Sequence, residues 1–335
     1  MRATVIGMAL SIAVVAVTPQ NLFSAAHAAV STPLELETKI PLGNVAGRID
    51  HMAIDLARRR LFVAELGNSS VSVVDITAQK VARRITGFKE PQGLGYLSRF
   101  DALYVASAGD GSVRILAGSD LKEDGRIDLG EDADNVRIDQ AEARVFVGYG
   151  SGGLAVIDPE ARRKLVDIGL VGHPEAFQLE SRGNRIFVNV PDARSLAVVD
   201  RTGGKSLAKW STGRLGGNFP MALDEDRKQV IVVFRTPPQL VAFSMDDGTV
   251  VADASTCGDS DDVFVDAKRR RIYVSCGEGF VDVFTGDQGF RRIGHIPTAS
   301  GARTSLFVPA FDRFFVAVRA RSGRPAAIWI YRPVS

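Results

Sequence analysis

Cysteine, aromatic side chains and net charge are all scarce in this chain, and each scarcity limits what it can do. Among 335 residues there are two cysteines, 7% aromatic residues, and 41 lysines and arginines against 39 acidic residues, a formal net charge of +2. This balance lacks the concentrated basic face of a nucleic-acid-binding protein, so we expect no nucleic-acid partner. The CxxCH, HExxH and GxSxG motifs are absent, so no local signature of covalent haem, a zinc protease or a serine hydrolase is present.

Long apolar runs are missing except near the N-terminus. Residues 5–17 form one such run after Arg2, and a small-residue site follows that ends at Ala28. This is the pattern of a cleaved signal peptide, and the run is too short to span a bilayer comfortably. We therefore expect a signal peptide over residues 1–28, cleaved near Ala28, no membrane insertion, and a periplasmic or secreted mature chain over residues 29–335.

The chain does contain a repeat. Its clearest element is a short apolar strand that occurs seven times, LFVAE in the first copy and FFVAV in the last. The central valines of these strands are Val63, Val105, Val147, Val188, Val232, Val274 and Val316. They are spaced by 42, 42, 41, 44, 42 and 42 residues, which is the period of a four-stranded propeller blade.

The pattern within each copy predicts the fold. Short strands bounded by turn-forming residues are typical of an antiparallel meander. The seventh copy has no room for a fourth strand before Ser335, but a spare strand, LELETKIPL, stands at 34–42. Pairing this strand with three C-terminal strands closes a ring and leaves no open sheet edge. We therefore predict an all-β, single-domain, seven-bladed β-propeller of four-stranded antiparallel blades, with the N-terminal strand completing the last blade.

Residues 60–96 carry a family resemblance. They read RLFVAELGNSSVSVVDITAQKVARRITGFKEPQGLGY, with a second strand, an Asn/Gly turn, a "V-x-V-h-D" third strand and a Pro-Gly entry to the next blade. This stretch resembles the repeat of YVTN-type β-propellers, and the resemblance extends over essentially the whole mature chain. It implies the propeller fold in an exported bacterial protein. It implies no single activity, because such propellers include binding proteins, surface proteins and enzymes.

Basic residues cluster at 58–60 and 268–271, which are the same turn in two copies of the repeat. We interpret both clusters as solvent-exposed hairpin turns.

The two cysteines, Cys257 and Cys276, lie in one repeat. Cys257 precedes the first strand of this repeat and Cys276 ends the second, so both lie at the same end of an antiparallel hairpin. In an oxidising compartment this placement predicts a disulfide. Two free buried thiols or a metal-binding pair are the alternatives.

The loops that enter successive blades converge on one mouth of the central channel, and here they are rich in ionisable and amide groups. Their candidate ligand or metal residues are Asp50, His51, Gln92, Asp134, Asn135, His173, Glu175, Asn218, Asp261, Asp262 and Arg303. Oxygen ligands would favour Ca²⁺, and histidine with carboxylate would favour Zn²⁺ or Mn²⁺. A metal there could activate water, as in a propeller lactonase or lyase. Alternatively, His51 or His173 could act as a general base while Arg303 holds an anionic group.

A purely structural interpretation competes with these. Asp and Asn before a strand often bond to local backbone amides and stabilise turns, although turn chemistry does not call for His51, His173 or Arg303. The loops hold few aromatics beyond Phe88 and Phe219, which favours small ligands over a large protein partner. We therefore expect a monomer that binds a small molecule, a metal ion or a periplasmic protein at this ring. A metal-dependent hydrolase or lyase using the same ring is the alternative, and the sequence identifies no catalytic residue.

Overall fold

The computed structural model describes residues 1, 3–4, 32–287, 289–321 and 323–335. Contacts divide the chain into two units, Met1–Ser31 and Thr32–Ser335, and every strand belongs to the second. The apolar run and cleavage site of the predicted signal peptide lie outside the described residues. Within those residues the helices are four short 3₁₀ turns, none with the length or apolar character needed to cross a membrane.

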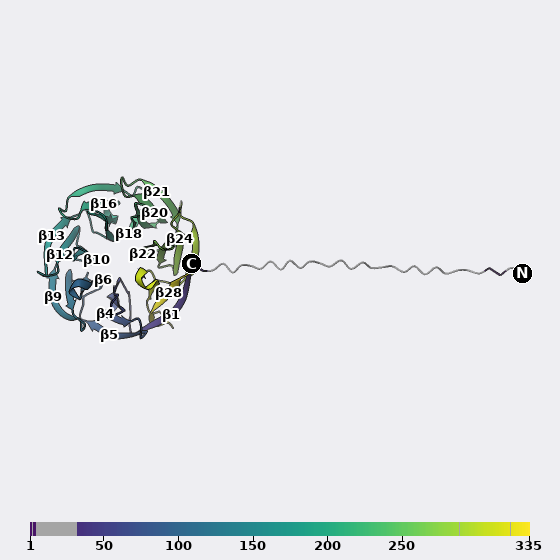
Figure 1. The fold of residues 1–335 in the computed structure, drawn as a ribbon, viewed down its shortest axis with the longest axis horizontal. Helices are drawn as coiled ribbons and strands as arrows, with labels where there is room; N and C mark the ends of the chain where they lie inside the picture. The colour runs from purple at the N-terminus through teal and green to yellow at the C-terminus, as the bar shows by residue number, and fades with distance from the viewer. Residues whose placement is uncertain (2, 5–31, 288, 322) are drawn as a thin grey trace. The chain divides into compact units, whose positions relative to one another are not determined.

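The second unit is a β-propeller of seven four-stranded antiparallel sheets around a central channel (Figure 1). Blade 1 comprises β2 (Met52–Asp55), β3 (Arg60–Glu65), β4 (Ser70–Asp75) and β5 (Lys80–Thr86). Blade 2 comprises β6 (Pro91–Leu97), β7 (Ala102–Ser107), β8 (Ser112–Ala117) and β9 (Lys122–Asp128). Blade 3 comprises β10 (Ala133–Asp139), β11 (Arg144–Tyr149), β12 (Gly153–Asp158) and β13 (Arg163–Gly169).

The remaining blades follow the same order from the channel outwards. Blade 4 comprises β14 (Phe177–Leu179), β15 (Arg185–Val190), β16 (Ser195–Asp200) and β17 (Ser206–Ser211). Blade 5 comprises β18 (Gly216–Asp224), β19 (Gln229–Thr236), β20 (Pro238–Ser244) and β21 (Val250–Ser255). Blade 6 comprises β22 (Ser260–Asp266), β23 (Arg271–Cys276), β24 (Phe280–Thr285) and β25 (Arg292–Pro297). The 3₁₀ turns are η1 (Leu66–Asn68), η2 (Ser98–Phe100), η3 (Pro191–Ala193) and η4 (Pro309–Phe311).

Blade 7 is closed by the N-terminal strand, as predicted. It comprises β26 (Ser305–Val308), β27 (Arg313–Val318), β28 (Ala326–Pro333) and, on the outside, β1 (Leu34–Gly43). β1 pairs antiparallel with β28 from Leu34 opposite Pro333 to Gly43 opposite Ala326. The two ends of the domain therefore meet in one sheet, which removes the open edges that an unclosed ring would have.

Burial explains why the second strand of each blade shows the clearest repeat. The seven central valines of these strands are all fully buried. In β3, the successive residues Leu61, Phe62, Val63 and Ala64 are all 0% exposed, because both faces of the sheet pack against neighbouring blades. A strand buried on both faces is a continuous apolar run, whereas the outer strand β5 is mostly exposed and correspondingly polar.

The predicted disulfide is confirmed. Cys257 and Cys276 are bonded, with their Cα atoms 5.8 Å apart. Ser260, at the start of β22, lies opposite Cys276 in the β22–β23 register, so the loop that enters this hairpin brings Cys257 to the end of β23.

The interpretation of the two basic clusters as solvent-exposed turns holds for Arg58, whose side chain is 39% exposed, but not for Arg269, and both arginines also pair with the next blade. The Arg58 guanidinium donates to both oxygens of Asp101 at 2.8 and 2.7 Å, and Asp101 belongs to the next blade. Arg269 does the same with Asp312, at 2.6 and 2.7 Å, and its side chain is only 10% exposed. These turns therefore link adjacent blades.

Candidate functional site

The loops that enter the blades enclose a polar cavity of about 240 Å³ at one mouth of the channel. It lies where the innermost strands of the blades begin, so residues far apart in sequence face one another. The mouth cavity is lined by Arg48, Asp50, His51, Gln92, Asp132, Asp134, Asn135, His173, Glu175, Ala176, Phe219, Arg235, Asp261 and Arg303. Nine of the eleven predicted ring residues belong to this lining.

The other two predicted residues lie elsewhere. Asn218 is fully buried between blades, where its side-chain amide donates to Asn189 Oδ1 at 3.3 Å and to the Ser195 carbonyl at 3.0 Å. Asp262 lines a second cavity further along the channel and accepts a hydrogen bond from the Ser305 backbone N–H at 2.7 Å. Asn218 thus connects two blades, and Asp262 belongs to the channel below the mouth.

Sequence reasoning missed three charged residues of the mouth, Arg48, Asp132 and Arg235. Arg235 does not come from an entry loop, because it lies near the end of β19. One signal could have identified it. The residue after the second-strand motif is Leu66, Ala108, Gly150, Pro191 and Gly277 in five copies, and arginine only at 235 and 319.

The backbones of blades 2 and 3 approach each other closely beside Asp134, one of the acidic residues of the mouth. A Cβ added to Gly93, in β6, would lie 1.7 Å from the backbone oxygen of Asp134, in β10. A Cβ on Gly95 would lie 2.6 Å from Val136 Cγ1. Glycine at both positions lets blade 2 pack directly against the innermost strand of blade 3, and this contact fixes the backbone that carries Asp134.

The arginines of the mouth are already paired with carboxylates. Arg48 Nη2 lies 2.7 Å from Asp50 Oδ2. Arg235 Nη2 donates to Asp261 Oδ1 at 2.5 Å, and Arg303 Nε lies 3.1 Å from the other oxygen of the same carboxylate. Arg303 also donates to Asp259 at 2.6 Å. The guanidinium of Arg235 lies 3.8 Å above the ring of Phe219. This cation–π contact, together with the pairing to Asp261, fixes the orientation of the guanidinium.

Two acidic side chains of the mouth have no such partner. Among the described residues, no arginine or lysine nitrogen lies within 4.0 Å of the carboxyl of Asp134 or Glu175, and neither accepts a hydrogen bond. Burial raises the pKa of Asp134 to about 8, with Asp50, Glu175 and Asp132 adding to the rise and His51 opposing it. Burial also raises the pKa of Glu175 to about 7, with Asp261 adding to the rise and Arg235 opposing it. Both groups are therefore carboxyls that hold protons near neutral pH.

The two histidines of the mouth differ in their contacts. His51 Nε2 lies 3.7 Å from Asp50 Oδ1 and 4.0 Å from Asp134 Oδ1, beyond hydrogen-bond distance of both. His173 Nδ1 lies 2.6 Å from the Gly150 carbonyl oxygen. Since a carbonyl only accepts, that nitrogen carries the proton, and Nε2 of the neutral ring is left as an acceptor. His295, on the outer strand β25, binds Asp282 and stacks on Phe280, away from the mouth.

The described side chains do not form a ready-made metal centre. No three or more histidine, cysteine, aspartate or glutamate residues of the described ranges converge in a way that could hold a metal ion. The site offers unpaired acceptors and protonated acids rather than a coordination sphere.

No family model matches the chain, and no curated protein matches it. Solved structures do resemble it. A chain in a crystal structure of the mitotic checkpoint complex is similar with a TM-score of 0.75 and 13% identity, over 98% of this chain and 99% of that one. A chain of hydrazine synthase from Kuenenia stuttgartiensis is similar with a TM-score of 0.65 and 15% identity, over 88% of this chain and 95% of that one. At such identities the likeness establishes the propeller fold alone.

Proposed function

We propose that this chain is an exported propeller of the YVTN type that binds a small, positively charged ligand at the mouth of its channel. The ligand class is an organic ammonium or a metal ion. The seven-copy repeat and the closed ring support the family assignment, and the N-terminal apolar run supports export. The mature protein is expected to begin at Ala29 and to work in the periplasm or outside the cell, which the intact mass of the purified chain would test.

One observation carries the proposed ligand class. Asp134 and Glu175 are enclosed carboxyls with no arginine or lysine partner among the described residues, and the His51 imidazole comes no closer to Asp134 than 4.0 Å, while the arginines beside them are paired with other carboxylates. An enclosed carboxylate is costly unless it is paired. A ligand that brings a positive charge and hydrogen-bond donors would supply the missing partner and displace the protons that the carboxyls now hold.

Turn chemistry alone does not account for this arrangement. Asp50 fits that interpretation, because its carboxylate accepts the backbone N–H of His51 at 3.1 Å. Asp134 and Glu175 accept no N–H from the described backbone, so they stabilise no turn in this way. Stabilisation of turns therefore accounts for Asp50 but not for Asp134 and Glu175.

The cavity favours a compact ligand. Its volume of about 240 Å³ lies just below the usual range for pockets that bind drug-sized molecules. An ammonium group needs only hydrogen-bond acceptors in roughly the right directions, whereas a metal ion needs ligands converging on one point. The geometry therefore favours an organic ammonium over a metal ion, and it does not favour the metal-dependent hydrolase or lyase.

Calorimetric titration of the mature protein tests the proposal. We would titrate putrescine, a small diamine, and separately Ca²⁺, Zn²⁺ and Mn²⁺, at pH 6, 7 and 9. Because Asp134 and Glu175 must lose protons to pair with a cation, affinity should rise with pH, and binding at pH 7 should release roughly one proton. The released protons are counted by repeating the titration in buffers with different ionisation enthalpies.

Matched variants identify the residues responsible. The double variant Asp134→Asn/Glu175→Gln should lose binding and proton release together. Asp226→Asn, which removes a carboxylate that is 66% exposed, should keep both. Binding that is independent of pH, or unchanged in the double variant, would refute the proposal. Tight metal binding without putrescine binding would restore the metal interpretation.

A further inference from the structure

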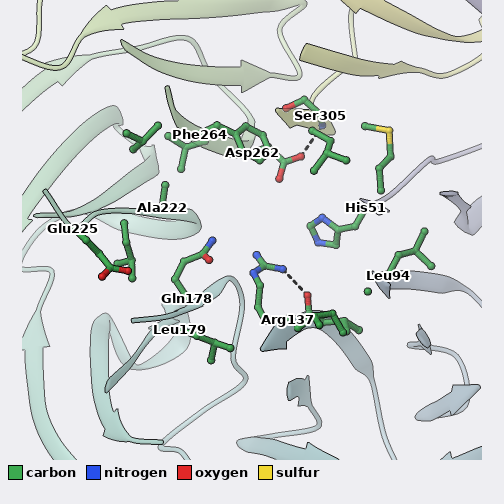
Figure 2. A pocket seen from close by; sticks show the side chains of 18 residues that line it. His51, Leu94, Arg137, Gln178, Leu179, Ala222, Glu225, Asp262, Phe264 and Ser305 are labelled. Carbon is green, nitrogen blue, oxygen red and sulfur yellow. Dashed lines mark hydrogen bonds between the residues drawn. The ribbon is translucent and has the colours of Figure 1, made fainter. Parts of the chain in front are cut away.

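A second cavity, of about 480 Å³, lies in the channel below the mouth. His51 lines both cavities, so the two spaces adjoin at its imidazole. Figure 2 shows Arg137, Gln178, Asp262 and His51 pointing towards the middle of this space from different blades. Most of the other lining residues have apolar side chains, among them Met52, Leu94, Val136, Leu179, Phe264 and Leu306.

Arg137 is the unusual member of this wall. It lies on β10, the innermost strand of blade 3, and its one hydrogen bond runs from Nη1 to the Val136 carbonyl at 2.9 Å. Its guanidinium lies 5.6 Å from the centre of the Phe177 ring. Across the described parts of the chain, no carboxylate oxygen lies within 4.0 Å of it, unlike the three arginines of the mouth. The guanidinium therefore has free donors that face the cavity.

The charges around Arg137 do not neutralise it. Burial acts to lower the pKa of its guanidinium, and Asp262 and Asp134 oppose that effect, yet an arginine keeps its charge in proteins. Burial raises the pKa of Asp262 well above its usual value, with Asp261 adding to the rise. The Ser305 N–H and Arg137 oppose this rise, but no oxygen of the Asp262 carboxyl lies within 4.0 Å of an Arg137 nitrogen. The channel thus encloses a positive charge whose partner is missing.

The surroundings of this charge define the missing partner. A guanidinium binds a carboxylate through two parallel hydrogen bonds. The side-chain amide of Gln178 donates one of its two N–H groups to the Met221 carbonyl at 2.8 Å, so one N–H remains to donate to a carboxylate. Arg137 is the one arginine or lysine among the described residues of this lining, and the carboxylate of Glu225, which also lines it, accepts hydrogen bonds from Ser181 and from the Arg182 backbone N–H. One cationic group among mostly apolar side chains suits a ligand with one anionic end and an apolar body. A phosphate would need more cationic side chains than the described wall provides.

We propose that the channel cavity is a binding site for a small monocarboxylate with an apolar body, whose carboxylate pairs with Arg137. This site is separate from the cation site at the mouth, since the two share only His51 in their linings. The mouth can fail as a cation site and the channel can still bind the carboxylate. The apolar body lies along the side chains of Leu94, Phe264 and Leu306.

The test compares hexanoate with its neutral counterpart hexanamide, each titrated into the mature protein and followed by calorimetry. The wild type should bind hexanoate roughly tenfold more tightly than hexanamide, because only the carboxylate forms a charge-assisted pair. Arg137→Gln should lose this preference. Two controls should retain it: Arg182→Gln, which removes an arginine that is 74% exposed, and Glu175→Gln, which alters the mouth alone.

Thermal unfolding gives a second test of Arg137 that requires no ligand. Arg137→Gln removes an enclosed charge without a counter-ion, so its thermal unfolding midpoint should equal or exceed that of the wild type. Three results would overturn the proposal: equal binding of the two probes by the wild type, no hexanoate binding by the wild type, or a preference that persists in Arg137→Gln. A lowered midpoint for Arg137→Gln would assign the guanidinium a structural role and would also overturn it.

Discussion

The enclosed carboxyl of Asp134 gives the mouth a property that can be measured without any ligand. Its pKa is raised to about 8, far above the value of about 3.9 in an unfolded chain. Between these two values the folded protein binds a proton that the unfolded protein has lost. The folded state is therefore favoured at low pH, and this contribution is lost as pH rises through 8.

Asp134→Asn should reveal this effect, since the amide resembles the protonated acid at every pH. We expect the variant to be more stable than the wild type at pH 8, with the difference shrinking towards pH 5 at up to roughly 1.4 kcal/mol per pH unit. Urea unfolding of both proteins at pH 5, 6.5 and 8 measures it. Asp226→Asn is the control, because its carboxylate is exposed. A difference that does not depend on pH would contradict the raised pKa.

At the scale of the element, the hairpin turns of two blades act as links to the next blade. In blade 6, Arg269 Nη1 donates to Asp266 Oδ2 at 3.0 Å, and the phenol of Tyr273 donates to the same oxygen at 2.7 Å. Arg269 reaches Asp312 of blade 7 with both terminal nitrogens. This link holds the pKa of Asp312 well below its usual range. Blade 1 repeats the arrangement with Arg58 and Asp101.

Arg269→Gln should therefore destabilise the fold. Its side chain is 10% exposed, and removing it leaves the 2%-exposed Asp266 without its cation. We expect the free energy of unfolding to fall by roughly 2–4 kcal/mol. Arg270→Gln, one residue away and 71% exposed, should change it by no more than about 0.5 kcal/mol. Chemical denaturation of the two variants compares them directly, and equal effects would show that the link contributes nothing.

The sequence predicted strands and blades well because burial governs them directly. Val63 and its six counterparts must be apolar wherever a strand is covered on both faces, so the repeat is visible in the chain itself. Pairing between side chains leaves no such periodic trace. Arg269 is a charged residue in a turn, as many exposed residues are. Only the position of the next blade shows that its guanidinium donates to Asp312.

The candidate site was predictable to the extent that it follows the entry loops. Asp50, Asp134 and Glu175 stand at the same point of their repeats, so they converge on the mouth. Asn218 lies one residue before the equivalent position, which Phe219 holds, and its side chain turns into the contact between blades. Arg137 was missed because it lies within a strand, where the sequence does not show which side chain faces the channel.

At the scale of the whole molecule, closure of the ring depends on one strand. Without β1 (Leu34–Gly43), the backbone groups of β28 would be unpaired along the outer edge of blade 7. Exposed edges of this kind pair with other chains. A mature chain lacking residues 34–43 should therefore unfold at a lower temperature than the full domain and form larger assemblies.

Size-exclusion chromatography with light scattering, together with calorimetry, measures both effects. The control is Leu36→Ser, since this side chain is 44% exposed and its backbone pairing is retained. It should behave as the full domain does. A truncated chain that kept both the size and the melting temperature of the full domain would show that the other strands suffice.

The pairing of β1 with β28 also orders events in time. The two strands lie at opposite ends of the domain, and their contacts include Glu35 with Arg332, which are 297 residues apart. A ribosome makes β1 before the other strands of the domain and β28 after them, so β1 has no partner until strands β2 to β27 have been made. Contacts between such distant residues form slowly. The ring can close only after residue 333 has been made, which leaves the domain open while blades 1 to 6 are already available to form.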